Sequence, residues 1–239
     1  MQCVILAGGL GTRMRPLTST LPKTLLPVCG KPFAWHQLHW LAAQSVTEVV
    51  YSIGHQGDQI RRYWDRELPP VDSIRYIDEG PRLRGTGGAL RLAFEEGALR
   101  ESFLVLYGDS FLPIPLGGLW SAFESGSDPV MMTVHKNDGR WDRSNVIYAG
   151  GRVRLYDKNP DPITATYMRY IDYGLSAVRR RVIEAVRRPL FDLAWLYRRL
   201  SIEGQLAGYE VAQRFYEIGS PQGLRELEQY LASPIKVYC

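Results

Sequence analysis

The stretch Leu6-Ala7-Gly8-Gly9-Leu10-Gly11-Thr12-Arg13 decides the fold, because it joins the end of an apolar run to a glycine-rich turn. Residues Cys3 to Ala7 form a short apolar run, which predicts a buried strand. Glycines after a strand allow unusual backbone dihedrals and let N–H groups approach an anion closely. Arg13, Arg15 and Lys23 bring positive charge to the same rim. The pattern therefore predicts a phosphate-binding turn.

Two better-known phosphate loops are excluded by the residues that follow the glycines. A P-loop ends in Gly-Lys-Ser/Thr, whereas Gly11 is followed by Thr12-Arg13. A dinucleotide fingerprint needs a third glycine three residues after Gly11, and that position is Met14. An ordinary turn with scattered arginines would explain the glycines alone. The later Pro22-Lys23 and Pro27 favour the phosphate site instead.

Four segments together resemble the signature of sugar-1-phosphate nucleotidyltransferases. Within that family, the sequence resembles the heptose- and mannose-1-phosphate guanylyltransferases most. They are Leu6–Arg13, Arg15–Thr18, Pro22-Lys23 and Leu26–Val28. The resemblance implies that the glycine loop wraps the triphosphate of an NTP and that Arg13 and Lys23 are catalytic residues that neutralise its charge. The implied nucleotide-binding residues of this loop are Leu6, Ala7, Gly8, Gly9, Gly11 and Thr12.

Length and composition are those of an ordinary globular protein. The chain has 239 residues, of which 45% are hydrophobic and 23% charged, enough for one large α/β domain. No apolar run is long enough to span a membrane, and the amino terminus does not resemble a signal peptide. The formal net charge is only +4, and the basic residues are dispersed, which argues against nucleic-acid binding. We expect a cytoplasmic protein with no membrane or nucleic-acid partner.

Cysteine and histidine usage excludes two classes of site. The three cysteines, Cys3, Cys29 and Cys239, are odd in number and form no CxxC pair, which argues against a disulfide framework and against a zinc site. We therefore expect the protein to work in a reducing compartment. His36 and His39 lie three residues apart on a predicted helix, but no third ligand stands at a suitable spacing, so helix packing is the better interpretation. A Gly-x-Ser-x-Gly elbow for nucleophilic catalysis is also missing from the sequence.

The first half of the chain alternates between strand and helix patterns. Expected helices are 33–44, 56–67 and 86–96, and expected strands are 48–53, 73–77 and 103–107. Alternation of this kind implies βαβ units, a mainly parallel sheet and helices on both faces. The predicted fold is a Rossmann-like, three-layer αβα nucleotidyltransferase fold with a mixed, mainly parallel central sheet. Ligands of such sheets gather at the carboxyl ends of the strands.

The pattern changes beyond about residue 128. Expected strands are 130–135, 145–148, 152–156, 171–177 and 209–218, and expected helices are 179–186 and 191–203. A last helix is expected from Ser220-Pro221, a capping serine followed by a proline in the first turn. With no linker or repeat, residues 1–239 are expected to form a single domain, with a nucleotide-binding half at 1–127 and a sugar-phosphate acceptor half at 128–239.

Two carboxylates are the candidate ligands of a metal ion. Phe103 to Tyr107 forms an apolar strand that ends in Gly108-Asp109, where an acidic side chain faces the ligand crevice. Mg²⁺ favours one or two carboxylates together with phosphate oxygens, although a turn aspartate is the simpler alternative. In the family, this Gly-Asp holds the metal, which makes Asp109 a catalytic metal ligand. Glu217 stands where the family usually has aspartate, so its metal role is an open expectation.

A third block, Glu79 to Leu90, contains another glycine loop before a helix. By its pattern alone it could be a second anion site. The family resemblance implies instead that this loop, with Gly85 and Thr86, packs on the nucleobase, where Glu79 could accept hydrogen bonds from guanine. GTP is therefore the favoured nucleotide, although related uridylyl- and thymidylyltransferases have similar loops.

The fourth block, Tyr156 to Pro160, resembles the Glu-Lys-Pro segment of the family with Asp157 in place of glutamate. The resemblance implies that Lys158 is a catalytic residue that holds the acceptor phosphate and that Asp157 holds sugar hydroxyls. An exposed turn is the alternative, since Asp, Asn and Pro are turn formers. Asp172 and Gly174 are further candidates for the sugar pocket.

The expected reaction transfers a nucleotidyl group from an NTP, preferably GTP, to a sugar-1-phosphate, preferably heptose-1-phosphate, and releases pyrophosphate with Mg²⁺ as cofactor. A uridylyl- or thymidylyltransferase acting on another hexose-1-phosphate is one alternative, and a non-catalytic nucleotide-sugar sensor is another. A metal-dependent glycosyltransferase would typically show an Asp-x-Asp pair, but Asp109 is followed by Ser110-Phe111. The sequence leaves the oligomeric state open, a homo-oligomer included.

Overall fold

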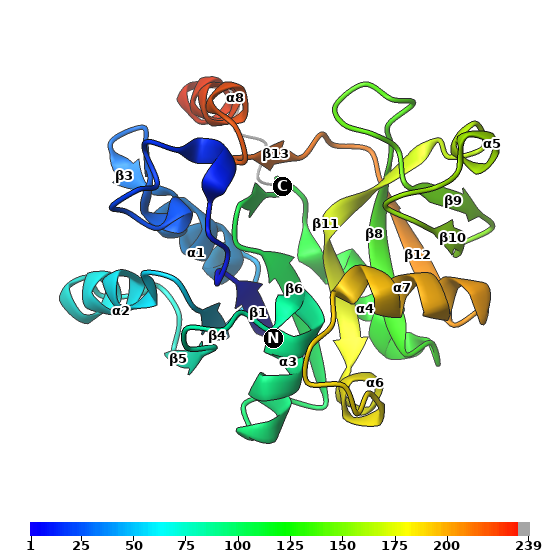
Figure 1. The fold of residues 1–239 in the computed structure, drawn as a ribbon, viewed down its shortest axis with the longest axis horizontal. Coiled ribbons are helices and arrows are strands. Elements are labelled where there is room, and N and C mark those ends of the chain that lie inside the picture. The colour runs from blue at the N-terminus through cyan, green and yellow to red at the C-terminus, as the bar shows by residue number, and fades with distance from the viewer. Residues whose placement is uncertain (234–239) are drawn as a thin grey trace.

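A nine-stranded sheet runs through the protein in the order β5-β4-β1-β6-β11-β8-β12-β10-β9 (Figure 1). The computed structural model describes residues 1–233. The strands are β5 (Ser73–Asp78), β4 (Glu48–Ile53), β1 (Gln2–Leu6), β6 (Ser102–Tyr107), β11 (Tyr170–Arg179), β8 (Val130–Lys136), β12 (Leu206–Val211), β10 (Arg152–Tyr156) and β9 (Val146–Ala149). β5, β4, β1 and β6 are mutually parallel, as are β8 and β12, whereas β11 and β10 run opposite to their neighbours. The predicted mixed, mainly parallel sheet is confirmed.

Helices cover both faces of this sheet, as the predicted three-layer architecture requires. The helices are α1 (Phe33–Ala43), α2 (Gly57–Arg66), α3 (Gly85–Glu95), α4 (Leu116–Ser125), α5 (Pro162–Ala165), α6 (Arg180–Ala185), α7 (Leu193–Ile202) and α8 (Pro221–Ala232). Buried side chains of α1, α2, α4 and α8 belong to one hydrophobic core, and those of α3, α6 and α7 belong to a second core. The two cores lie on opposite faces of the sheet, because neighbouring residues of β1 alternate between them.

β1 lies between β4 and β6 and is buried along almost its whole length. A strand with parallel neighbours on both sides and helices on both faces is expected to be apolar, which explains the run Cys-Val-Ile-Leu after Gln2. The register pairs Leu6 with Tyr107, so the two strands end at the same level. The amide of Gly108 continues this pairing by donating a hydrogen bond to the Leu6 carbonyl over 3.0 Å.

The expected strand 209–218 is wrong, and the correction matters for the site. The chain leaves the sheet after β12 ends at Val211, and a separate two-residue strand, β13 (Tyr216–Glu217), pairs antiparallel with β7 (Ser110–Phe111). Residues 212–215 between them form no ladder. This departure from the sheet places Glu217 opposite Ser110, the residue that follows Asp109.

Most other expected elements are confirmed to within a few residues, including the last helix, where the Ser220 hydroxyl accepts a hydrogen bond from Gly223 N over 3.0 Å. α4 was not predicted, because Gly117-Gly118 in its first turn have low helix propensity. Its Leu116, Leu119 and Phe123 are fully buried, so tertiary packing stabilises it. The division into nucleotide and acceptor halves stays a prediction.

Cys3 and Cys29 are free thiols, the first buried and the second exposed, and Cys239 lies outside the described residues. Within residues 1–233, no helix combines the length and the apolar character needed to cross a membrane.

We predict that Gly108→Ala destabilises the protein, because a Cβ at this position would lie 2.6 Å from the Leu6 carbonyl oxygen and 3.0 Å from Ala7 Cα. Both neighbours are backbone atoms that move only if β1 and β6 separate. The expected loss is about 1–3 kcal/mol in the free energy of unfolding, measured by chemical denaturation. Gly117→Ala is the matched control, because its Cβ would meet nothing within 4 Å. That variant should gain up to about 1 kcal/mol in its helix, and equal midpoints for the two variants would contradict the prediction.

Candidate functional site

A cleft opens where β1 and β6 end, at the carboxyl edge of the parallel strands. Its wall includes the first glycine loop (Leu6 to Gly9), Lys23 and Asp109, together with Glu79, Gly85 and Thr86 of the second glycine loop. Most of the residues that the sequence assigned to nucleotide binding therefore surround one space. Gly11 and Thr12 do not line it.

Lys23 and Asp109 meet inside this cleft. Lys23 begins a 3₁₀ turn (Lys23–Leu25), and Asp109 follows β6. The Lys23 ammonium lies 2.6 Å from Asp109 Oδ2, and both side chains are largely shielded from solvent, with 18% and 24% of their surfaces exposed. As expected, the two residues share a cleft although the chain separates them widely. A cation and a carboxylate are thus held together in the wall of the cleft.

Glu217 lies beside this pair, because β13 pairs with β7 and Ile218 N donates a hydrogen bond to the Asp109 carbonyl over 3.0 Å. Burial raises the pKa of Glu217 to about 7, and repulsion from the carboxylates of Asp109 and Asp142 adds to that shift. Lys23 and Arg13 act in the opposite direction but do not cancel it. At Glu217, burial and the neighbouring carboxylates therefore outweigh the attraction of the two cations.

These two carboxylates fit a Mg²⁺ ion bound jointly with a nucleotide. Mg²⁺ typically takes one or two carboxylates and completes its coordination with phosphate oxygens and water. Asp109 and Glu217 supply oxygen ligands of this kind, and the repulsion between their carboxylates is one that a cation between them would relieve. Across residues 1–233, no group of three or more His, Cys, Asp or Glu side chains is placed to hold a metal ion.

Arg13 lies in a second hollow, and Glu217 is part of the wall of that hollow. A Cβ at Gly219 would lie 3.5 Å from Arg13 Nη2 and 3.7 Å from Glu217 Oε2, so the guanidinium and the carboxylate approach the same point. The loop that carries Arg13 is held by Thr18, whose hydroxyl donates to the Gly11 carbonyl over 2.8 Å. Gly11 adopts a positive φ of 60°, which favours glycine.

The second hollow also contains residues that sequence reasoning missed, Asp142 and Arg214. The Arg214 guanidinium lies 3.7 Å from the centre of the Trp141 ring and 4.8 Å from that of Tyr216, and it forms an ion pair with Glu226. These side chains come from three separate segments. Nothing in local spacing could have identified them, because only the tertiary fold brings the 138–143 loop over β13.

Two amides of the second glycine loop are already occupied, which argues against the anion-site interpretation of its sequence. The amides of Gly87 and Gly88 at the start of α3 both donate to the Phe191 carbonyl over 3.0 Å. Donors that are occupied by the protein cannot bind a phosphate. Glu79 lies in the cleft wall, where its carboxylate accepts hydrogen bonds from the Ser52 hydroxyl over 3.3 Å and from Arg84 N over 2.8 Å. Burial raises the pKa of Glu79.

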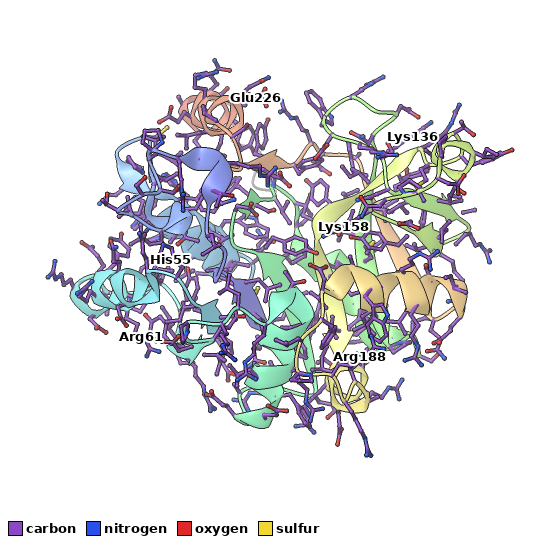
Figure 2. All side chains as sticks on the ribbon, viewed as in Figure 1. His55, Arg61, Lys136, Lys158, Arg188 and Glu226 are labelled. Atoms are coloured by element: carbon purple, nitrogen blue, oxygen red, sulfur yellow. The ribbon has the colours of Figure 1, made fainter. Side chains whose placement is uncertain are left out.

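Lys158 belongs to the second half of the chain and is labelled near the middle of the view in Figure 2. Its ammonium lies 5.9 Å from the centre of the Tyr107 ring, which is part of the cleft wall, and 3.8 Å from Asp192 Oδ1. Asp157 pairs instead with Arg198 over 2.9 Å. The structure thus places the Lys158 ammonium near Tyr107 of the cleft wall, whereas its neighbour Asp157 is engaged by Arg198.

Asp172 and Gly174 lie close to Lys158. Asp172 Oδ1 accepts a hydrogen bond from Gly174 N over 2.9 Å, and Oδ2 accepts one from the Tyr156 hydroxyl over 3.4 Å. Burial raises the pKa of Asp172, and the charge of Lys158 offsets part of that shift. Gly174 has a φ of 95°, and a Cβ there would lie 3.0 Å from Ser110 Oγ. Its backbone therefore passes close to β7.

The pattern of the MobA-like NTP transferase domain family matches residues 3–198, which is most of the chain. The chain belongs to this family. The resemblance to nucleotidyltransferases that the first glycine loop suggested is confirmed at this level.

A mannose-1-phosphate guanyltransferase beta-B of Xenopus laevis is 27% identical over 228 residues, or 93% of this chain. A D-glycero-alpha-D-manno-heptose 1-phosphate guanylyltransferase of Aneurinibacillus thermoaerophilus is 34% identical over 116 residues, or 48% of this chain.

The chain spans only part of these relatives, 62% of the first and 49% of the second. Among solved structures, HddC from Yersinia pseudotuberculosis, complexed with GMP-PN, superimposes with a TM-score of 0.80 over 96% of this chain and 99% of that one, at 23% identity. A putative glucose-1-phosphate thymidylyltransferase from Bacillus anthracis gives a TM-score of 0.82 over 98% of this chain and 96% of that one, at 21% identity. These likenesses establish the fold.

We predict that Glu217→Gln stabilises the metal-free protein above neutral pH. With its pKa raised from 4.5 to about 7, the folded chain binds the Glu217 proton more tightly than the unfolded chain does, so stability falls as pH rises through that window. Glutamine removes this loss, and we expect a gain of about 1–3 kcal/mol at pH 8 that shrinks toward pH 5. Thermal unfolding in the presence of a chelator measures it.

Glu226→Gln is the matched control, because its pKa is lowered, mainly by hydrogen bonds to Gln222 and Arg214. The sign reverses there, since the carboxylate stabilises the folded state above its ordinary pKa. That variant should lose stability at pH 8. Equal melting temperatures for Glu217→Gln and the parent protein at pH 8 would contradict the account of Glu217.

Proposed function

We propose that the protein transfers a nucleotidyl group from an NTP to a sugar-1-phosphate and releases pyrophosphate. The observation that carries this proposal is the meeting of Lys23, Asp109 and Glu217 at the end of the first glycine loop. A cationic and an acidic group side by side suit a substrate that arrives with several phosphates and a divalent ion. Family membership and the mannose- and heptose-1-phosphate guanylyltransferases among the relatives support the same reaction.

In the proposed reaction, an oxygen of the sugar phosphate attacks the α-phosphorus in line, and pyrophosphate leaves. Bound at Asp109 and Glu217, Mg²⁺ would supply charge neutralisation between the reacting phosphates. Lys23, already within the cleft, would bind the phosphates of the NTP, and Arg13 would bind the departing pyrophosphate from the second hollow. No nucleophile or proton acceptor from the protein is needed, so catalysis consists of positioning and charge stabilisation.

Lys158 would bind the phosphate of the acceptor, because it approaches the cleft from the opposite half of the sheet. The buried Asp172 and the Gly174 backbone are placed to line the sugar pocket behind it. Asp157 is the weakest of the proposed residues, because Arg198 already pairs with it. The first glycine loop, from Leu6 to Thr12, remains the proposed cradle of the triphosphate.

GTP and heptose-1-phosphate are the substrates that we favour. Glu79 stands in the cleft wall beside Gly8, where a carboxylate can accept hydrogen bonds from the N1 and N2 donors of guanine, and Gly85 and Thr86 line the same wall. The named activities of the relatives agree with this choice. A cytoplasmic location and the lack of nucleic-acid and membrane partners are predictions from composition alone.

We predict that Asp109→Ala lowers the turnover of pyrophosphate release by about 10²–10³-fold, the usual effect of removing one preorganised charge. The loss arises because the cleft then lacks a carboxylate for the cation and leaves Lys23 without its partner. A coupled pyrophosphate assay with saturating substrates measures it.

Asp128→Ala is the control for this variant. Asp128 also pairs with one cation, Arg152 over 2.8 Å, and has a similar exposure of 22%, but it lies before β8, at the opposite edge of the sheet. Its activity should stay near that of the parent protein. Undiminished turnover in folded Asp109→Ala would refute the metal assignment.

We also predict that, among the four NTPs tested against a panel of sugar-1-phosphates, GTP gives the highest kcat/KM. Glu79→Gln should lower that value by about 10- to 100-fold with GTP and much less with UTP, because it removes a charged hydrogen-bond acceptor. Activity restricted to UTP or dTTP would refute the role of Glu79. If no pair of NTP and sugar-1-phosphate releases pyrophosphate but the protein binds a nucleotide sugar, the result would favour the alternative of a non-catalytic nucleotide-sugar sensor.

A further inference from the structure

One short segment, residues 189–193, contacts both ends of the cleft. On the nucleotide side, the Phe191 carbonyl accepts hydrogen bonds from Gly87 N and Gly88 N, and Phe191 N donates to the Arg84 carbonyl over 3.1 Å. Leu193 N donates to the Thr86 hydroxyl over 2.8 Å. These four hydrogen bonds tie the segment to the first turn of α3.

This contact leaves little space for movement. A Cβ at Gly85 would lie 2.7 Å from the Phe191 carbonyl oxygen, and a Cβ at Gly87 would overlap the Phe191 ring. The glycines of the second loop are thus explained by the close approach of 189–193. Any side chain that this segment carries toward the cleft is held in a fixed relation to the nucleotide wall.

Asp192 is such a side chain. Its Oδ1 accepts a hydrogen bond from Ala194 N over 2.7 Å and so caps α7. The same oxygen lies 3.8 Å from the ammonium of Lys158. A lysine on four flexible methylenes, 45% exposed, is oriented by the carboxylate near it, and the cap fixes where that carboxylate stands.

The acidic neighbour of Lys158 in sequence cannot do this. Asp157 accepts hydrogen bonds from Arg198 over 2.9 Å and from Asn159 N over 2.9 Å, so its carboxylate is already engaged by other partners. The remaining carboxylate near Lys158 in the cleft is Asp172, which is buried and already accepts from Gly174 N and the Tyr156 hydroxyl. Asp192 alone of these three combines a fixed position with contact to the ammonium.

We propose that Asp192 is a positioning residue for Lys158: anchored to the nucleotide wall through residues 189–193, it holds the lysine ammonium where the acceptor phosphate binds. This inference rests on the proposed function. It links the acceptor end of the cleft to the nucleotide end through the backbone of Phe191 and the cap of α7.

The test is Asp192→Asn, which keeps the helix cap, since asparagine caps as well as aspartate does, and removes the charge. The KM for the sugar-1-phosphate should rise about two- to fivefold, which corresponds to the interaction energy of a half-exposed ion pair. The kcat and the KM for the NTP should stay unchanged. Lys158→Met should raise the same KM by a larger factor. In the double variant, Asp192→Asn should add nothing to Lys158→Met, because Asp192 acts through that lysine.

Asp161→Asn is the matched control, because Asp161 caps α5 in the same way, accepting from Ile163 N and Thr164 N, away from the cleft. Its kinetics should equal those of the parent protein. The inference is overturned if the acceptor KM of Asp192→Asn is unchanged or lowered, or if the effects add in the double variant. The proposed function still stands in that case, provided that Lys158→Met is impaired. An unimpaired Lys158→Met overturns both the inference and the acceptor role of Lys158.

Discussion

The parallel pairing of β1 with β6 is the constraint on which the site depends. Because Leu6 and Tyr107 are in register, the first glycine loop and Asp109 leave the sheet side by side. The hydrogen bond from Gly108 N to the Leu6 carbonyl extends the ladder one step beyond the strands, into the region where side chains become functional. A shift of the register would move Asp109 away from Lys23 and separate cation from carboxylate. The site is thus a consequence of backbone geometry before it is one of side-chain chemistry.

The charges of the site are matched to one another only in part. Lys23 neutralises Asp109, but Glu217 stays close to a second carboxylate in a buried position, and its pKa is raised to about 7 as a result. Burying unpaired charge costs stability, which a protein retains most readily where a ligand supplies the missing partner. An NTP together with a divalent cation brings both signs of charge at once. The metal-free protein is therefore expected to be less stable than the loaded one.

The sequence predicted those parts of the fold that local pattern controls. The apolar run before Gly8, the alternation of elements in the first half and the Ser220 cap each depend on neighbouring residues, and each was found in the structure. β13 was missed because two residues cannot show periodicity, and α4 because packing outweighs the low helix propensity of its glycines. Arg214 was missed since its partners come from distant segments.

The two glycine loops show how far similar sequences can differ in physical role. In the first loop, the lack of a side chain at Gly8, where a Cβ would meet Glu79, leaves space in the cleft. In the second loop, the glycines let the backbone of residues 189–193 approach α3, and the amides that might have bound a phosphate bind Phe191 instead. The second loop thus lines the cleft through Gly85 and Thr86 and contacts residues 189–193 through Gly87 and Gly88. Because residues 189–193 also carry Asp192, which lies 3.8 Å from the Lys158 ammonium, the packing of the second loop bears on where that lysine is held.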